Sequence, residues 1–272
     1  MIRDITIGQY YPGYSVIHKL DPRLKIICTL LYITSLFIIK GLIGYVIIFA
    51  GIAAVIACSG TPVKFLLRGL KPIMIIIIFT FTLNMFMTKG TILFSWYFLT
   101  ITYEGIYTAF FMALRLIFLI IGSSLLTLTT KPMKLTDGIE SLLIPFKKMG
   151  APTHELAMMM TIALRFIPTL LEETDKIMKA QQARGADFES GSIFRRAKAL
   201  IPLFIPLFVG AFRIAQDLAL AMEARCYRGG EGRSKLSPLK YKRRDLVAAL
   251  VTLAFLGSTI IERIYVHSFF VT

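Results

Sequence analysis

Two short segments of the chain carry the same pair of residues, an alanine followed by an arginine. The first is "AQQARGADF" at residues 180–188, and the second is "AMEARCYRG" at residues 221–229. A guanidinium group is always charged, and its planar fork of donors matches the two oxygens of a carboxylate. In the last turn of a helix an arginine also interacts with unpaired carbonyl groups, a local effect of about 0.3–1 kcal/mol. The repetition favours two equivalent helix tips, each suited to a carboxylate in the groove of a partner protein.

The residue after the arginine differs between the two segments. The first continues with Gly185, and glycine is the usual residue in the left-handed turn that ends a helix. The second has Cys226 in this place, and a residue with a side chain enters the left-handed region at a cost. We therefore expect that the second helix ends differently, or that Gly229 and Gly230 provide its turn.

The other reactive residue types form no constellation for catalysis or metal binding. The segment "RGGEGRSK", residues 228–235, lacks the G-x-x-x-x-G-K-[ST] order of a phosphate-binding loop and is expected to be a flexible cytoplasmic loop. The histidines stand alone in the sequence, so neither a zinc site nor a catalytic dyad is predicted. The cysteines have no paired spacing and are expected to be free thiols. These residues are His18, His154 and His267, and Cys28, Cys58 and Cys226.

The elements that must position the two segments belong to a membrane protein. Of the 272 residues, 56% are hydrophobic, and they occur in long apolar runs rather than with the period of a soluble amphipathic helix. A straight crossing needs about 20 residues, and flanking lysines and arginines can extend the shorter runs. The first 25 residues lack a signal-peptide pattern, so the first run is expected to remain as an anchor. We expect five spans, at residues 26–39, 42–58, 72–87, 105–130 and 246–261.

The position of the basic residues predicts the orientation of these spans. The net charge is +15, and 27 of the 31 lysines and arginines fall before the first span, between the second and third, or between Lys131 and Arg244. Such alternation follows the positive-inside rule. The positive charge is therefore explained by the orientation of the protein in the membrane, and it gives no reason to expect nucleic acid as a partner. The N-terminus and residues 131–244 are therefore predicted to be cytoplasmic, and the C-terminus external.

The sequence thus predicts an all-α integral membrane protein with about five transmembrane helices and a cytoplasmic domain of long amphipathic helices. Residues 1–130 would form a membrane domain with four spans, and residues 245–272 the last span with the external C-terminus. The cytoplasmic domain, residues 131–244, would contain helices near 136–149, 153–184 and 192–225. The apolar run at 199–212 contains two prolines, and we place it against the inner leaflet or on its sister helices.

The predicted spans contain no aspartate, glutamate or histidine, which argues against transport driven by an ion gradient. Arg115 is the one charge well inside a span. It is expected to pair with carbonyl groups or with a carboxylate outside that span, or to face a partner. Residues 91–105 mix aromatic and β-branched types at a membrane edge and suggest an outer interfacial hairpin, with Trp96 and Tyr97 as belt residues.

From end to end the chain resembles the T component of energy-coupling-factor transporters, the integral-membrane coupling subunit of a class of bacterial ABC-type uptake systems. The opening "GQYYPGYSVIHKLDPRLK" at residues 8–25 is similar to the family's first motif, and "LRFIPTLLEET" at 164–174 to its long coupling helix. The segments "AQQARG" and "AMEARC" fall where paired Ala-Arg-Gly motifs are expected. The resemblance implies a multi-pass, non-catalytic subunit of the bacterial cell membrane, without a cofactor or a metal of its own.

The resemblance also implies partners. Two ABC-type ATPase subunits would each receive one helix tip, and a membrane-embedded S component would bind the substrate, with vitamin uptake as the expected task. Flexible methionines suit repeated docking of an S component, although methionines at helical spacing also fit a plain core. The residues assigned to ATPase coupling are Ala183, Arg184, Gly185, Ala224, Arg225 and Cys226, and those assigned to docking are Met158, Met159 and Met160.

A second reading is a polytopic membrane enzyme that acts on an anionic lipid or phosphate. Four arginines would form its anion site, and the acidic residues available as a base form no motif of known chemistry. Activity of the isolated chain on a lipid would favour this enzyme, whereas co-purification of ATPase subunits would favour the coupling subunit. The residues concerned are Arg165, Arg184, Arg213 and Arg225, with Glu172, Glu173, Asp217 and Glu223 as candidate acids.

Overall fold

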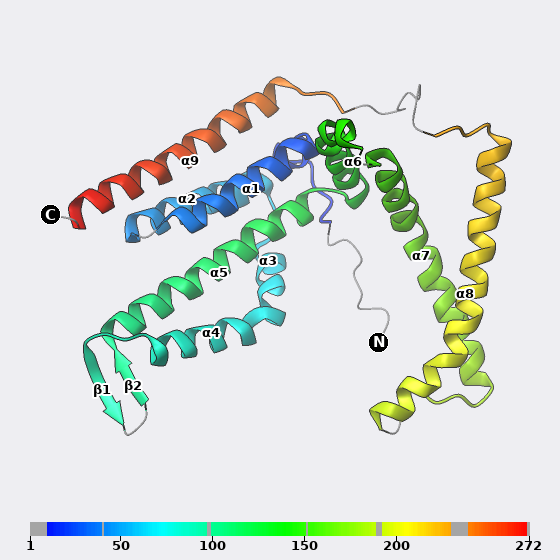
Figure 1. Ribbon diagram of the computed structural model, residues 1–272, viewed down its shortest axis with the longest axis horizontal. Coiled ribbons are helices and arrows are strands. Elements are labelled where there is room, and N and C mark those ends of the chain that lie inside the picture. Colours follow the sequence, from blue (N-terminus) through cyan, green and yellow to red (C-terminus); the bar gives the residue numbers. More distant parts are fainter. Residues whose placement is uncertain are drawn as a thin grey trace. The chain divides into compact units, whose positions relative to one another are not determined.

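A computed structural model of the chain describes two compact units. The bundle unit contains the described residues of 7–139 and 239–272, and the long-helix unit contains those of 140–238. Both units are built from helices, and one short hairpin is added to the bundle unit (Figure 1). The described residues are 10–39, 41–96, 99–150, 152–188, 192–229 and 239–270.

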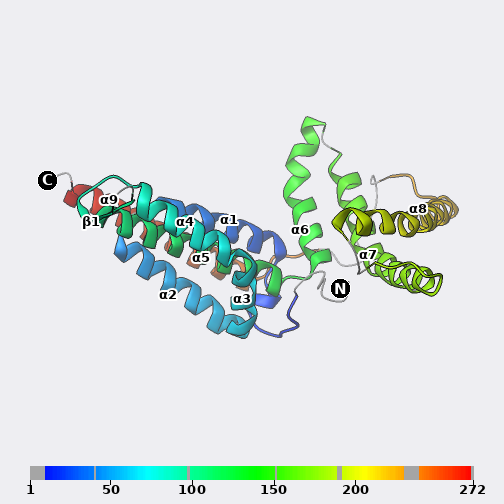
Figure 2. The ribbon, with the colours of Figure 1, turned by 90° about the horizontal axis from the view of Figure 1, so that it is seen from below.

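The helices of the bundle unit pack around one central helix. In both views α1, α2, α4, α5 and α9 lie side by side (Figure 1 and Figure 2), and α5 contacts α1, α2, α3 and α4, while α9 contacts α1 and α2. The elements are η2 (Ile17–Lys19), α1 (Pro22–Ile38), α2 (Leu42–Ser59), α3 (Val63–Leu70), η3 (Lys71–Ile73), α4 (Met74–Met87), α5 (Tyr103–Thr129) and α9 (Arg243–Phe270).

The bundle has a small apolar core and a large apolar surface. Leu36, Ile39 and Ile48 are completely buried, whereas Ile75 is 78% exposed and Phe79 is 62% exposed. Lipid tails can cover such side chains, and helices satisfy their backbone hydrogen bonds internally, as the bilayer requires. Among the described residues six helical stretches are long and apolar enough to cross a membrane, at Leu42–Ser59, Val63–Met87, Tyr103–Thr129, Thr153–Ala183, Lys198–Ala224 and Arg243–Tyr265. The chain is therefore a multi-pass helical membrane protein.

Several helices begin earlier or end later than predicted. The first begins at Pro22 instead of residue 26, because the side chain of Asp21 accepts a hydrogen bond from the Arg23 amide and caps it. The third predicted span is the second part of a longer helical stretch that passes through a 3-10 turn at Pro72. The last helix continues past residue 261, so Glu262 lies within it and is 7% exposed. The expected absence of acidic residues from the spans therefore does not hold for this helix.

Two charged side chains support the junction between α1 and α2. The Arg115 guanidinium donates a hydrogen bond to the carbonyl oxygen of Ile39 at 3.2 Å, which is one of the pairings expected for it. Glu262 Oε1 accepts a hydrogen bond at 3.3 Å from the amide of Gly44, in the first turn of α2. An acidic side chain from α9 thus meets the N-terminal end of α2, where negative charge is favourable.

The hairpin expected at residues 91–105 is present. Strands β1 (Ile92–Trp96) and β2 (Leu99–Thr102) pair in antiparallel fashion, and Tyr97 lies outside the described residues. Glu104, in the first turn of α5, holds the base of the hairpin because its Oε2 accepts a hydrogen bond from the Thr91 amide at 2.7 Å. The hairpin is therefore fixed to the start of the central helix.

The long-helix unit begins within α6 (Pro132–Leu143), which starts before the predicted residue 136, and continues through η4 (Ile144–Met149). Helix α7 covers Thr153–Ala183 and α8 covers Ile193–Ala224, against predicted ranges of 153–184 and 192–225. The two helices contact each other (Figure 1).

We predict that Gly105→Ala destabilises the bundle, because a Cβ atom at residue 105 would lie 2.7 Å from the carbonyl oxygen of Met85 in α4. Overpacking against backbone should cost about 1–3 kcal/mol. Gly257→Ala in α9 is the matched control, since nothing lies within 4 Å of its added Cβ, and alanine is the better helix former by up to about 1 kcal/mol. Thermal unfolding in detergent measures both. Equal midpoints for the two variants would contradict the close approach of α4 and α5.

Candidate functional site

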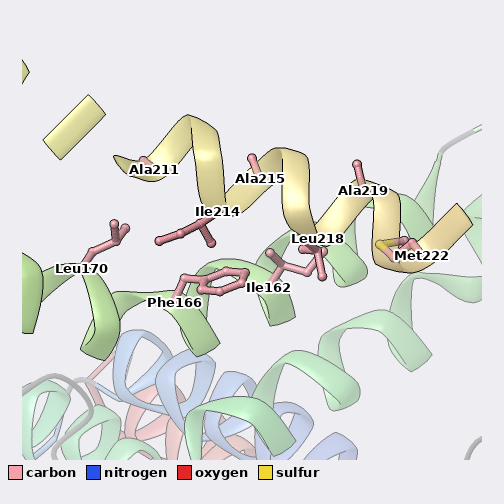
Figure 3. A pocket seen from close by; sticks show the side chains of 9 residues that line it. All are labelled: Ile162, Phe166, Leu170, Ala211, Ile214, Ala215, Leu218, Ala219 and Met222. Carbon is pink, nitrogen blue, oxygen red and sulfur yellow. The ribbon is translucent and has the colours of Figure 1, made fainter. Parts of the chain in front are cut away.

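Helices α7 and α8 form an antiparallel pair that places the two Ala-Arg segments. Phe166 and Ile162 of α7 face Ile214 and Leu218 of α8 across an apolar cavity of about 200 Å³ (Figure 3). The chain direction of the two helices is opposite, because residues early in α7 meet residues late in α8. The full lining is Ile162, Phe166, Leu170, Ala211, Ile214, Ala215, Leu218, Ala219 and Met222.

The antiparallel arrangement puts the two tips at opposite ends of the pair. The Tyr227 hydroxyl, just after the tip of α8, donates a hydrogen bond to the sulfur of Met158 at 3.0 Å, so this tip lies beside the first turns of α7. Arg184 lies 26 residues beyond Met158 along α7. At 1.5 Å of rise per residue, the two arginines are separated by about 40 Å.

The first tip ends in a regular left-handed turn. Helix α7 ends at Ala183, and Gly185 has a φ of 88°. The Gly185 amide donates to the carbonyl of Gln182 at 2.9 Å, and the Ala186 amide donates to that of Gln181 at 3.0 Å. These two hydrogen bonds are the pair that satisfies the last carbonyls of a helix when the chain reverses through a left-handed residue.

The second tip ends in the same way, although it has no glycine at this position. The Cys226 amide donates to the carbonyl of Glu223 at 2.8 Å, and the Tyr227 amide donates to that of Met222 at 3.0 Å. Cys226 itself has a φ of 55°, and among the described residues it is the one non-glycine residue with a positive φ. The expectation that this helix ends differently, or that Gly229 and Gly230 provide its turn, is therefore wrong. The two backbone bonds offset a strain of about 1–2 kcal/mol.

The arginine side chains at the two tips make no polar contact with other described residues. Arg184 and Arg225 are both exposed, and neither guanidinium has an ion pair or hydrogen bond with another residue in the part of the chain that the structure describes. Each follows an exposed alanine, whose small side chain leaves room for a partner surface to approach. Each tip can therefore offer a fork of donors to a carboxylate on another protein.

The three methionines assigned to docking do not share one environment. The sulfur of Met158 accepts the hydrogen bond from Tyr227 and belongs to the contact between α7 and the tip of α8. Met159 is 57% exposed and Met160 is 42% exposed. Two of the three are therefore available on the surface of the long-helix unit.

The structure does not assemble the four-arginine anion site of the enzyme alternative. Arg184 and Arg225 lie at opposite ends of the helix pair, and Arg165 and Arg213 are exposed residues within α7 and α8. One anionic group cannot reach both ends of a pair about 40 Å long. Among the described residues, moreover, no group of three or more histidine, cysteine, aspartate or glutamate side chains could hold a metal ion.

Three features of the site were not predicted. His154 does not stand alone, because its Nδ1 lies 3.2 Å from Glu140 Oε1 and links α6 to α7. The contact between Tyr227 and Met158 joins residues 69 apart, for which no local pattern exists. The cavity did leave a signal, because alanines four residues apart at 211, 215 and 219 mark one face of α8.

Comparisons with known proteins agree along nearly the whole chain. The family model described as cobalt transport protein, CbiQ, matches residues 13–236, which include both Ala-Arg segments. The energy-coupling factor transporter transmembrane protein EcfT of Thermosediminibacter oceani is 59% identical over 251 residues, which are 92% of this chain and 95% of the relative. The protein of the same name from Clostridium kluyveri is 57% identical over 97% of this chain and 99% of its own. The protein of the same name from Bacillus subtilis is 48% identical over 94% of this chain and 98% of its own.

We predict that Cys226→Gly stabilises the protein by up to about 1 kcal/mol, because glycine adopts the left-handed conformation without the side-chain strain. The matched control is Cys58→Gly in α2, where glycine should instead destabilise the helix by about 1 kcal/mol. Thermal unfolding in detergent measures whether each substitution raises or lowers the stability of the protein. Destabilisation of similar size by both substitutions would show that residue 226 is not left-handed.

Proposed function

This chain belongs to the family of energy-coupling factor transporter transmembrane proteins, the T components, and on that basis we propose how it works. It couples two cytoplasmic ABC-type ATPase subunits to a membrane-embedded S component that binds the substrate, a vitamin. The chain itself does not hydrolyse ATP. Its helices carry the motion of the ATPases to the S component in the cell membrane.

The observation that carries this proposal is the pair of matching tips at opposite ends of α7 and α8. Both tips close through the same two backbone hydrogen bonds, and both expose an alanine and an arginine without an intramolecular ion pair among the described residues. A separation of about 40 Å is too large for one socket. It suits two copies of the same socket, as two ATPase subunits would supply.

The charges of α7 support a cytoplasmic location for these tips. Helices α7 and α8 are long and apolar enough to cross a membrane, but five charged residues lie between Glu172 and Lys179 of α7. Each would cost roughly 2.5–3.5 kcal/mol at the centre of a bilayer. The positive-inside pattern likewise places the N-terminus and residues 131–244 in the cytoplasm and the C-terminus outside.

An apolar face of α8 supports the third partner. Ile201, Ile205, Phe208 and Phe212 recur at helical spacing and are between 54% and 68% exposed. The long-helix unit itself does not cover these side chains. Among the large apolar side chains of residues 199–212, Leu203 alone is buried. Packing on sister helices therefore does not account for this segment. We assign this face, together with Met159 and Met160, to contact with the S component at the membrane surface.

We predict that Arg184→Glu and Arg225→Glu each reduce substrate uptake at least tenfold while the protein still inserts and holds its S component. Breaking a shielded charge pair at an interface costs on the order of 2–5 kcal/mol, whereas an arginine that merely caps its own helix contributes less than about 1 kcal/mol. Because both ATPases must act together, the double variant should be little worse than either single variant.

Uptake into cells and co-purification of the ATPase subunits measure these effects. Arg213→Glu is the matched control, since Arg213 is an exposed arginine of α8 away from the tips, and it should transport normally. Normal uptake by the Arg184→Glu protein would exclude the coupling role and leave only a helix cap.

We also predict that a cysteine introduced at Ala186, beside the first tip, is protected from an impermeant thiol reagent in intact cells. If α7 and α8 both crossed the membrane, residue 186 would be outside, while the C-terminus would be outside in either case. A cysteine at Thr272 therefore serves as the labelled control in a background without the three native cysteines. Labelling at residue 186 would place the tip of α7 beyond reach of a cytoplasmic ATPase.

A further inference from the structure

Buried charged side chains tie three helix ends of the bundle unit together. The carboxylate of Asp245, which is 4% exposed, uses both of its oxygens. Oδ1 accepts a hydrogen bond from the Asp21 amide at 2.8 Å, and Oδ2 accepts one from the Lys242 amide at 2.7 Å. Since Asp21 caps α1 and Lys242 immediately precedes α9, one carboxylate joins the N-terminal ends of both helices.

Lys25 makes the corresponding connection to the central helix. Its ammonium group donates to the carbonyl of Thr129 at 2.9 Å and to the hydroxyl of Thr130 at 3.1 Å, at the C-terminal end of α5. The side chain is 7% exposed. The three helix ends lie on the same side of the bundle (Figure 1). Acidic groups thus meet helix N-termini and a cation meets a C-terminus, so each charge has the sign that its helix end favours.

In the sequence, the chain leaves the bundle unit and returns to it close to these helix ends. Thr130 is followed by α6, within which the chain passes to the long-helix unit at Glu140, and the chain returns to the bundle at Leu239. The returning segment is held on α1, because Arg23 donates to the Leu239 carbonyl at 3.3 Å and its guanidinium lies 5.3 Å from the ring centre of Tyr241. Both connections are therefore fastened to the first turn of α1.

We propose that Asp21, Lys25 and Asp245 form the joint through which displacement of the long-helix unit reaches the membrane bundle. Asp245 and Lys25 are positioning residues for transport in this view, which rests on the proposed function. Packed apolar faces can slide past one another by small shear movements. Directional hydrogen bonds from buried charges resist such sliding, so they can pull α1, α5 and α9 as one body.

The test is the ratio of substrate taken up to ATP hydrolysed by the complete complex reconstituted in vesicles. Asn at position 245 has one acceptor oxygen and must lose one of the two hydrogen bonds. Asp245→Asn should therefore keep ATPase co-purification and hydrolysis within twofold of wild type while uptake per ATP falls at least tenfold. A purely structural role would change stability without changing this ratio in the molecules that fold.

Glu104→Gln is the matched control. Glu104 also lies in the first turn of a bundle helix and accepts hydrogen bonds from the amide and hydroxyl of Thr91, but it does so at the opposite end of α5, away from both chain connections. Its uptake per ATP should stay within twofold of wild type. An equal loss of coupling in both variants, or an unchanged ratio in Asp245→Asn, would overturn the joint.

If Asp245→Asn does not fold, substitutions of Lys25 decide the question. Lys25→Met removes the connection to α5 and should lower uptake per ATP, whereas Lys25→Arg keeps donors at this position and should restore most of it. Equal ratios for these two variants would count against the joint. Failure of the proposed function has a different signature, because wild-type protein would then not co-purify with ATPase subunits at all.

Discussion

The two tips depend on one backbone constraint, the left-handed residue that closes each of the helices α7 and α8. A helix leaves its last carbonyls unpaired, and the turn through Gly185 or Cys226 pairs them with the amides that follow. The guanidinium group of the preceding arginine is therefore not needed to pair these carbonyls, and the turn fixes the position of its backbone. Cys226 keeps this geometry despite its side chain, so the two tips are alike in shape as well as in sequence.

The length and direction of the helix pair keep the two similar tips far apart. Helices of 31 and 32 residues packed in opposite directions carry their tips at opposite ends. Under the proposed function, closure of two ATPases would move both ends of the helix pair. The exposed apolar face of α8 would carry that movement to the S component, while the buried charges at residues 21, 25 and 245 would carry it to the bundle.

Local patterns in the sequence predicted most of the helices, the hairpin and the two Ala-Arg segments, because periodicity, apolar runs and repeated motifs are local. They did not predict the short helix α3. They were insufficient wherever distant residues meet. Asp21 and Asp245 are 224 residues apart, and no local pattern in either segment predicts their contact. The last helix was ended too early because Glu262 breaks its apolar run, although one oxygen of the carboxylate accepts a hydrogen bond from the Gly44 amide. Cys226 is left-handed although residues with a side chain rarely adopt this conformation, because the two backbone hydrogen bonds of the turn stabilise it.

Cross-linking at the two tips distinguishes two ATPase sockets from one. A photoreactive amino acid in place of Ala183, Ala224 or both leaves the arginines intact in the assembled complex. We predict that each single substitution captures one ATPase subunit and that the double substitution yields a product containing one copy of this chain and two ATPase subunits. A double-substituted protein that never captures more than one ATPase would contradict the account, because both tips would then share a single socket or one tip would have none.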